Sequence, residues 1–384
     1  MTSATTAQLA TEAKSRREQD AVLAAAIGSL SARVYALENP GVVVPPPVIT
    51  PPPATPPDPG TRPWPSPVTT RTVAIPSYID ATGATDVTAA LRAFIAGVPD
   101  GSIITAAPAA IYKHAGNFMP PSRNNLILDG NGAALRNTAT SGGNGGSAIY
   151  WSWLDKPFPT HLTFRNWTAQ GANPKPGSMS ANEFGAFLHA MGGSYLELDN
   201  ITASGLMGDL ATFNENPDHA WVHGCHVIDC GRNVVSIMCG SDILVEDLVV
   251  GRAGYCFFDI EPETGSVAGI ARVTVRRNRI GTWGNCFVAV DGANAGKPIA
   301  DIVIDGNTVT GPEVVVNKQV VSWASLLSIV GFSGSGPKAR PQRVAFTNNT
   351  GPADALKFGH IDGLTVKGNS AAGTFLDCTG VVLA

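Results

Sequence analysis

The chain has 384 residues, of which 44% are hydrophobic and 15% charged, and it contains 42 glycines and 29 prolines. This composition allows a large core and favours strands joined by many turns. The formal net charge of −4 gives no positive field, so it excludes an electrostatic basis for binding nucleic acid or an anionic membrane.

The N-terminus and the cysteines bear on where the chain is made. The first thirty residues lack a basic segment followed by an apolar one, so we expect neither a secretory signal nor membrane insertion. No CxxC pair is present, which argues against a zinc site or a disulfide scaffold. We therefore expect synthesis in a reducing cytosol, with six buried free thiols at positions 225, 230, 239, 256, 286 and 378.

Residues 1–39 are predicted to contain a short coiled coil. Apolar residues alternate four and three apart, as in the seam of two heptads: Leu23, Ile27, Leu30, Val34 and Leu37. The run from Arg33 to Glu38 resembles the signature of trimeric coiled coils, in which the arginine covers the seam and pairs with the glutamate. We therefore predict a homotrimer. The alternative is a lone amphipathic helix that docks on another protein.

Residues 40–72 are predicted to be a proline-rich linker. Each proline lacks an N–H group and fixes φ, so the segment favours polyproline II at about 3.1 Å per residue and spans on the order of 80 Å. An SH3-type ligand is the competing interpretation, but no basic residue flanks Pro45 to Pro57. A coil followed by a spacer is the order needed to hold a β domain away from a surface.

The predicted β domain, residues 73–384, begins with a helix near 85–97. Thr85 or Asp86 caps this helix, Pro99-Asp100-Gly101 ends it, and one apolar face carries Val87, Leu91 and Ile95. The stretch from Ile79 to Gly101 resembles the entrance of pectate-lyase-like β-helix proteins. In that family such a helix plugs the first coil.

One strand–turn–strand phrase then recurs about every twenty to forty residues, which is the spacing of solenoid coils. Six copies are clear and three are weaker: LILDGNGA (126–133), LTFRNWTA (162–169), LELDNITA (196–203), VTVRRNRI (273–280), IVIDGNTV (302–309), LTVKGNSA (364–371), AWVHGCHV (220–227), ILVEDLVV (243–250) and VAFTNNTG (344–351). We predict an all-β fold, a right-handed parallel β-helix that forms a single-stranded solenoid of about nine coils. A β-sandwich, the alternative, does not repeat one phrase at this spacing.

Asparagine occupies the turn in the clearest copies. Because asparagine tolerates the left-handed conformation and its amide can bond the next asparagine along a stack, we expect a structural ladder. The expected members are Asn131, Asn278, Asn307, Asn349 and Asn369.

Three coils can be aligned after Gly231, Gly254 and Gly284, and alternation then separates an inward from an outward face. Inward positions include Asn233, Cys256 and Cys286. The two cysteines are expected to stack as thiols, at a spacing that we interpret as too constrained to imply a disulfide.

The outward face of these coils brings acids and rings together. Glu261 and Asp291 are expected side by side, with Asp259 two residues away on the same strand. Such acids suit cleavage of a glycan, because one of two neighbouring carboxyl groups has a raised pKa. The predicted glycan-binding residues beside them are Arg232, Tyr255, Phe257 and Phe287. Alternatively, the acids hold Ca²⁺, or they are solvated while the rings face a neighbouring subunit.

Two other patterns give no site. His219, His223, His226 and Cys225 resemble a metal cluster, but residues four apart on a strand lie roughly 13 Å apart, so His219 and His223 cannot share an ion. The acid and basic motifs of polygalacturonases, and a convincing lyase arginine, are not found. Neither a metal nor another cofactor is required.

The order of trimeric coil, proline spacer and β-helix resembles bacteriophage minor tail proteins, tail fibres and tail spikes. This resemblance implies synthesis in the bacterial host cytoplasm, location in the virion tail, contacts with other tail proteins and binding of a host cell-surface polysaccharide. Three copies would gain avidity through effective concentration. Two functions stay open: binding or attachment without turnover, or depolymerisation of an envelope polysaccharide by the acids above.

Overall fold

The computed structural model describes residues 63–384 apart from short stretches: 141–145, 153, 179–183, 263–267, 284–285, 292–296, 311–313, 317–318, 322–327, 331–339, 352–355, 360, 371–372, 377 and 384. These residues belong to one unit, Arg62–Ala384. The predicted coiled coil and the linker up to residue 62 lie outside the described residues.

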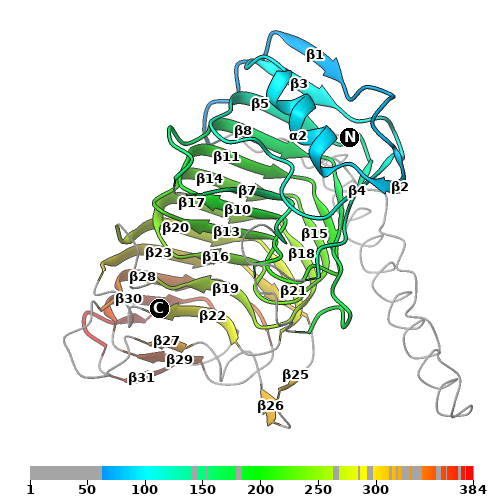
Figure 1. The fold of residues 1–384 in the computed structure, drawn as a ribbon. Coiled ribbons are helices and arrows are strands. Elements are labelled where there is room, and N and C mark those ends of the chain that lie inside the picture. The colour runs from blue at the N-terminus through cyan, green and yellow to red at the C-terminus, as the bar shows by residue number, and fades with distance from the viewer. Residues whose placement is uncertain are drawn as a thin grey trace, which may run out of the picture. The chain divides into compact units, whose positions relative to one another are not determined.

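The described residues form a parallel β-helix with three sheets, which we call A, B and C, and Figure 1 shows their strands stacked coil upon coil. Sheet A contains β1 (Arg71–Ala74), β3 (Ser102–Thr105), β5 (Asn124–Asp129), β8 (Thr160–Arg165), β11 (Ser194–Asp199), β14 (Asp218–His223), β17 (Gly240–Glu246), β20 (Ile270–Arg276), β23 (Ile299–Asp305), β28 (Gln342–Thr347), β30 (Asp362–Lys367) and β32 (Val382–Leu383).

Sheets B and C have nine strands each. Sheet B contains β2 (Thr82–Asp86), β4 (Ile111–His114), β6 (Ala134–Asn137), β9 (Thr168–Gln170), β12 (Thr202–Ser204), β15 (His226–Cys230), β18 (Val249–Ala253), β21 (Arg279–Trp283) and β24 (Thr308–Val309). Sheet C contains β7 (Ile149–Trp151), β10 (Leu188–Met191), β13 (Ala211–Asn214), β16 (Val235–Ile237), β19 (Cys256–Ile260), β22 (Cys286–Asp291), β27 (Ser328–Val330), β29 (Leu356–Gly359) and β31 (Gly373–Leu376).

The predicted right-handed parallel β-helix is therefore confirmed, since connections between parallel strands take the right-handed course. All nine recurrent phrases begin in sheet A, at β5, β8, β11, β14, β17, β20, β23, β28 and β30. The expected nine or so coils agree with the nine strands of sheet B and of sheet C, while β1, β3 and β32 extend sheet A beyond the recurrent phrases. A hairpin of β25 (Val314–Val316) and β26 (Gln319–Val321) is antiparallel and lies outside the three sheets.

The core lies inside the cylinder, where alternate residues of each strand meet. In sheet A the register pairs Leu196 with Leu162 and Leu198 with Phe164, and all four side chains are at most 1% exposed. Stacks of aliphatic and aromatic side chains of this kind continue through consecutive coils and exclude water from the interior.

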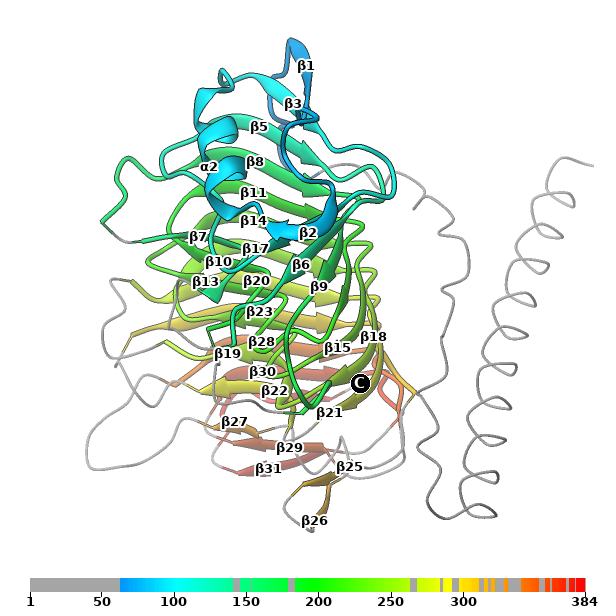
Figure 2. The ribbon, with the colours of Figure 1, turned by 45° about the vertical axis from the view of Figure 1, so that its right-hand side comes forward.

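The helix α2 (Thr88–Gly97) covers the N-terminal end of the stack, as predicted, and Figure 2 shows it beside the first strands. Its apolar face buries Leu91 and Ile95. Asp86 accepts hydrogen bonds from the backbone N–H and the hydroxyl of Thr88, which satisfies a donor of the first turn. Among the described residues, no helix is long and apolar enough to cross a bilayer.

The asparagine ladder is confirmed for four of its five predicted members. Asn278, Asn307, Asn349 and Asn369 bond one another through their side-chain amides at 2.9–3.2 Å. The left-handed residue is the one before each of these asparagines, such as Arg277 (φ 55°) and Asn348 (φ 55°). Asn131 was assigned wrongly: it has φ 50° itself and is exposed, because its turn contains two more residues than the turns of the ladder.

The expectation of six buried free thiols is wrong. Cys225, Cys230, Cys239 and Cys378 form no disulfide and Cys378 is only half-buried, whereas Cys256 is disulfide-bonded. Cys256 is opposite Cys286 in the register of β19 and β22, as predicted, and the side chain of Cys286 lies outside what the structure describes. Neighbouring parallel strands lie about 4.8 Å apart, which falls within the roughly 4.4–6.8 Å between the Cα atoms of a disulfide, so the spacing did not exclude one.

Candidate functional site

The outward face of sheet C contains a buried group of polar side chains, which we call the acid cluster: Asp209, Asn233, Ser236 and Asp259. Ser236 donates to Asp209 at 2.6 Å, and the Asn233 amide donates to both Ser236 (2.9 Å) and Asp259 (3.0 Å). None of the four side chains is more than 3% exposed. Two carboxyl groups are thus joined through one hydroxyl and one amide.

The electrostatics of the acid cluster follow from this burial. Burial, together with the negative charges of Glu261 and Asp209, raises the pKa of Asp259 to about 7. Burial also raises the pKa of Asp209, against the opposing charge of Arg232, whose Nη1 lies 3.7 Å from Asp209 Oδ2. The cluster therefore contains carboxyl groups that bind protons more tightly than solvated ones do.

The three coils aligned in the sequence analysis pair in the predicted register in the structure. Ser236, Asp259 and Ala289 are opposite one another, and so are Val235, Phe258 and Val288. Asn233 is the exception to the predicted faces. It lies before β16, and its side chain joins the outward acid cluster rather than the core.

The predicted site residues are only partly brought together. Asp259 and Arg232 both lie at the acid cluster, and half-buried Glu261 follows β19 directly, near enough to raise the pKa of Asp259. Phe257 is 0% exposed, so its ring offers no surface to a glycan, contrary to the prediction, because the outward face is buried at this level.

Three other predicted residues stay untested as ligands. Tyr255 is half-buried and its N–H donates to Arg232 O at 2.8 Å. The backbones of Phe287 and Asp291 lie in β22, while their side chains lie outside what the structure describes.

The outward face of sheet A carries a column of left-handed residues, one near the start of each strand from β5 to β30. In β8, β11 and β14 these are His161, Tyr195 and His219, whose rings stack with centroids 4.3 and 4.7 Å apart. The column continues with alternating charges, in which Arg272 bonds Asp242 through two nitrogens. Ring stacking and ion pairing thus offset the unfavourable φ angles along this edge.

A groove lies beside this column, and we call it the Trp64 groove. Its volume is about 380 Å³, and it is lined by Trp64, Asp242, Ile243, Leu244, Arg272, Thr274, Arg276, Asp301 and Val303. Trp64 contacts His219 edge to face at 4.8 Å, and its buried indole N–H has no hydrogen-bond partner within the described structure. Although Trp64 falls in the predicted linker, it packs on this face of the β-helix.

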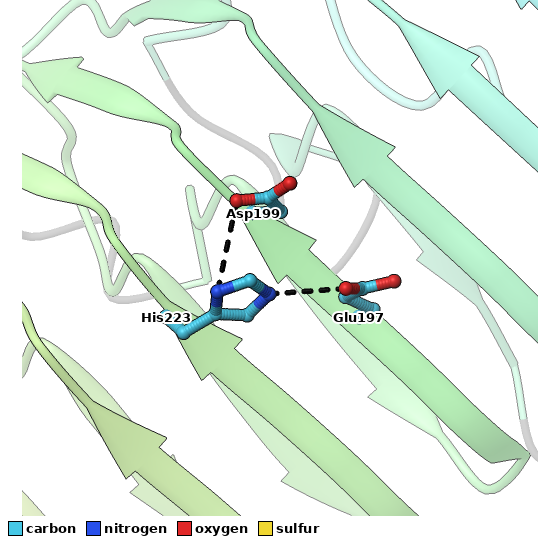
Figure 3. A group of neighbouring side chains, drawn as sticks. All are labelled: Glu197, Asp199 and His223. Atoms are coloured by element: carbon cyan, nitrogen blue, oxygen red, sulfur yellow. Dashed lines mark hydrogen bonds and ion pairs between the residues drawn. The ribbon is translucent and has the colours of Figure 1, made fainter. Parts of the chain in front are cut away.

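Further along the same sheet, His223 lies between two carboxylates (Figure 3). Its Nε2 is 3.0 Å from Glu197 Oε1, and its Nδ1 is 3.6 Å from Asp199 Oδ1. Ligand atoms of the three side chains lie within 4.8 Å of one another, but each ring nitrogen already faces a carboxylate oxygen. The arrangement therefore fits an imidazole that bridges two acids better than it fits a metal centre.

Thr163 completes this arrangement, because its hydroxyl donates to the second oxygen of Glu197 at 2.6 Å. His219 belongs to a separate group with Asp218 and Asp242, at the other end of β14. The two histidines thus do not converge on one ion in the described structure.

Asp209, His189 and Trp64 were not identified from the sequence as site residues. Asp209 and Trp64 lie in irregular segments, where strand alternation gives no signal, and His189 is a single histidine in a short strand. For His189 the signal exists only in three dimensions: it is 4% exposed and neither ring nitrogen has a hydrogen-bond partner.

No protein-family model and no curated protein sequence matches the chain. Solved structures with a similar fold include the Streptococcus pneumoniae surface adhesin PfbA, with 10% identity, a TM-score of 0.42 and coverage of 81% of this chain and 98% of that one. The family 28 exopolygalacturonase of Yersinia enterocolitica has 12% identity and a TM-score of 0.44, with coverage of 82% and 78%.

The tailspike protein of Escherichia coli bacteriophage HK620, solved with a pentasaccharide, has 11% identity and a TM-score of 0.42. The match covers 82% of this chain and 53% of the tailspike. These values describe a shared type of fold and carry no conclusion about activity.

Proposed function

We propose that this chain is a bacteriophage tail component whose β-helix binds a host cell-surface glycan without cleaving it. The Trp64 groove is the observation that carries the proposal. It combines an aromatic ring, an indole N–H without a partner, and arginine and aspartate side chains on the outside of the solenoid. Sugar recognition uses such a combination, because the ring packs on C–H groups while polar groups bond hydroxyls.

The assignment to a phage tail is supported by the order of segments in the sequence. A predicted trimeric coil (Leu23, Ile27, Leu30, Arg33, Val34, Leu37 and Glu38) and a proline-rich spacer precede the β-helix. In this proposal the N-terminal region contacts other tail proteins, and three grooves per trimer bind one glycan-covered surface together. Avidity then compensates for weak binding at each groove.

Substitution of Trp64 tests the binding proposal. We expect Trp64→Ala in the full chain to weaken retention on an array of bacterial polysaccharides about tenfold or more, as for a buried aromatic anchor. Tyr78→Ala is the matched control, because Tyr78 is 77% exposed and does not line the groove. Equal retention by both variants would contradict glycan binding at the groove.

A second candidate function is cleavage of the bound polysaccharide, and the raised pKa of Asp259 favours it. A group with a pKa of about 7 can donate a proton near neutral pH, and Glu261 and Asp291 are the proposed acids beside it. However, Asp209 and Asp259 are 0% and 3% exposed, so neither faces solvent. Binding is therefore the better supported function.

The cleavage proposal is tested by incubating the protein with the polysaccharides that bind it on the array and measuring the reducing ends released. If these acids cleave the polysaccharide, Asp259→Asn and the double variant Glu261→Gln/Asp291→Asn will both lose the activity. Undiminished release by both variants would remove these acids from any mechanism.

A further inference from the structure

We propose that the outward face of sheet C contains a second carbohydrate-binding site, in which a ring nitrogen of His189 bonds a hydroxyl group of the bound sugar. The ligand class rests on the proposed function. The site lies on a different sheet from the Trp64 groove, so the two can be tested separately.

The unsatisfied imidazole of His189 is the first observation. His189 is 4% exposed, and neither of its ring nitrogens has a hydrogen-bond partner in the described part of the chain. A buried polar group without a partner is costly, and such groups are uncommon in folded proteins. A ligand that bonds the ring would remove this cost.

The surroundings of His189 leave its nitrogens available. Phe184 is parallel to the imidazole, with centroids 6.2 Å apart and an interplanar angle of 7°, and Tyr150 lies 5.5 Å away at 60°. Stacking occupies the face of the imidazole, whereas hydrogen bonds form in the plane of the ring. Phe184 is 39% exposed, so a movement of this side chain would open the site to solvent.

The charge state of His189 selects the kind of ligand. Burial and the positive charge of Arg232 lower the pKa of His189 to about 4, so the ring is neutral at pH 7. A neutral imidazole has one donor and one acceptor. A sugar hydroxyl both donates and accepts, so it matches either nitrogen, whereas a carboxylate matches only the donor, and the charge of Arg232 disfavours a metal ion.

The apolar neighbours match the remainder of a sugar. Tyr150 and Phe184 present ring surfaces on which the C–H groups of a pyranose can pack. The competing occupant is one ordered water, which would also satisfy the imidazole but makes no use of the rings.

Saturation-transfer NMR on the full chain, with glucose, galactose, mannose and N-acetylglucosamine as probes at millimolar concentration, tests the proposal. We expect at least one sugar to bind the natural chain and its affinity to fall at least tenfold in His189→Phe, which keeps a ring and removes both nitrogens. Trp64→Ala should retain this signal. His226→Phe, in β15 of sheet B, is the matched control and should bind normally.

A structural role for His189 predicts a different result. If His189 holds only a water molecule, His189→Phe will bind sugars like the natural chain, and that result overturns the proposal, as does the absence of binding by the natural chain. Should His189→Phe not fold, Tyr150→Ala replaces it and is expected to weaken sugar binding, because it removes a ring surface at the site. Unchanged binding by this variant overturns the proposal. If Trp64→Ala loses retention on the polysaccharide array and His189→Phe leaves sugar binding unchanged, the proposed function stands and the second site is refuted.

Discussion

At the scale of single residues, the acid cluster is the feature with the largest expected energetic effect. Asp259 has its pKa raised from 3.8 to about 7. Between these values the folded state keeps a proton that the unfolded chain has released, so the free energy of unfolding falls as the pH rises. Folding is therefore expected to be favoured on the acidic side of this window.

Asp259→Asn should remove this dependence. As the pH rises from about 4 to about 8, we expect the unfolding free energy of the natural chain to fall by a few kcal/mol more than that of Asp259→Asn. The reason is that one pKa unit corresponds to about 1.4 kcal/mol. Denaturant unfolding of both proteins across this range measures the difference. Parallel pH profiles would contradict the assignment of the raised pKa to Asp259.

The asparagine ladder gives a second prediction at this scale. Asn307 accepts hydrogen bonds from the backbone and side chain of Asn278, and its amide donates to Val275 and Asn349. Asn307→Ala is expected to cost about 2–4 kcal/mol of unfolding free energy, because several buried groups lose their partners. Thermal and denaturant unfolding measure this cost.

The exposed Asn131 supplies the control. Asn131→Gly keeps the left-handed backbone accessible and breaks no ladder contact, so it should change stability by less than about 0.5 kcal/mol. Similar losses in Asn307→Ala and Asn131→Gly would mean that the ladder does not stabilise the fold.

Residue-level prediction from the sequence succeeded where alternation is regular. The register of Cys256 with Cys286 and of Asp259 with Ala289 follows from one repeated spacing. Asp209 could not be found in this way, because it precedes β13 and reaches the cluster only through the three-dimensional course of the chain. The burial of Phe257 could not be predicted either. Alternation shows which face of a strand a residue lies on, but it does not show whether other parts of the chain cover that face.

At the scale of elements, strand length decided what could be predicted. Strands of sheet A such as β11 have six residues, which is enough for alternation to identify them. Strands of sheet B such as β12 have three, and they were recognised only as the ends of the recurrent phrases. The helix α2 was predictable because its apolar face lies in one short segment, whereas its predicted cap was wrong: the N-cap residue is Val87, whose side chain makes no capping hydrogen bond.

Close approach of the short turns yields the prediction for this scale. A Cβ atom at Gly171, which follows β9, would lie 2.0 Å from Gly205 O, a backbone atom in the next coil. We expect Gly171→Ala to lower the unfolding free energy by roughly 2–4 kcal/mol, because adjacent coils must separate.

The same substitution at Gly97 should not lower the unfolding free energy. Gly97 is the last residue of α2, and nothing lies within 4 Å of the position of an added Cβ. Gly97→Ala is expected to be neutral or to stabilise by about 0.5–1 kcal/mol. Urea titrations of the two variants provide the comparison, and equal effects would contradict the close packing of the coils at Gly171.

At the scale of the whole molecule, the predicted trimer is the main untested property. If Leu30 and Val34 lie in a coiled-coil seam, the full chain should sediment at three times the mass of one chain. Leu30→Asp together with Val34→Asp should give monomers whose β-helix remains folded. A natural chain that is monomeric at micromolar concentration in analytical ultracentrifugation would contradict the trimer and, with it, the avidity expected of a tail component.

The central claim is that the outside of this solenoid binds glycan at the Trp64 groove. A crystal structure of the full chain with the polysaccharide fragment that the array retains most strongly is the most direct measurement. We predict a sugar ring packed against Trp64, with hydroxyl groups bonded to the indole N–H and to the charged side chains of the groove. A complex in which the sugar lies elsewhere and the groove is unaltered would contradict the claim.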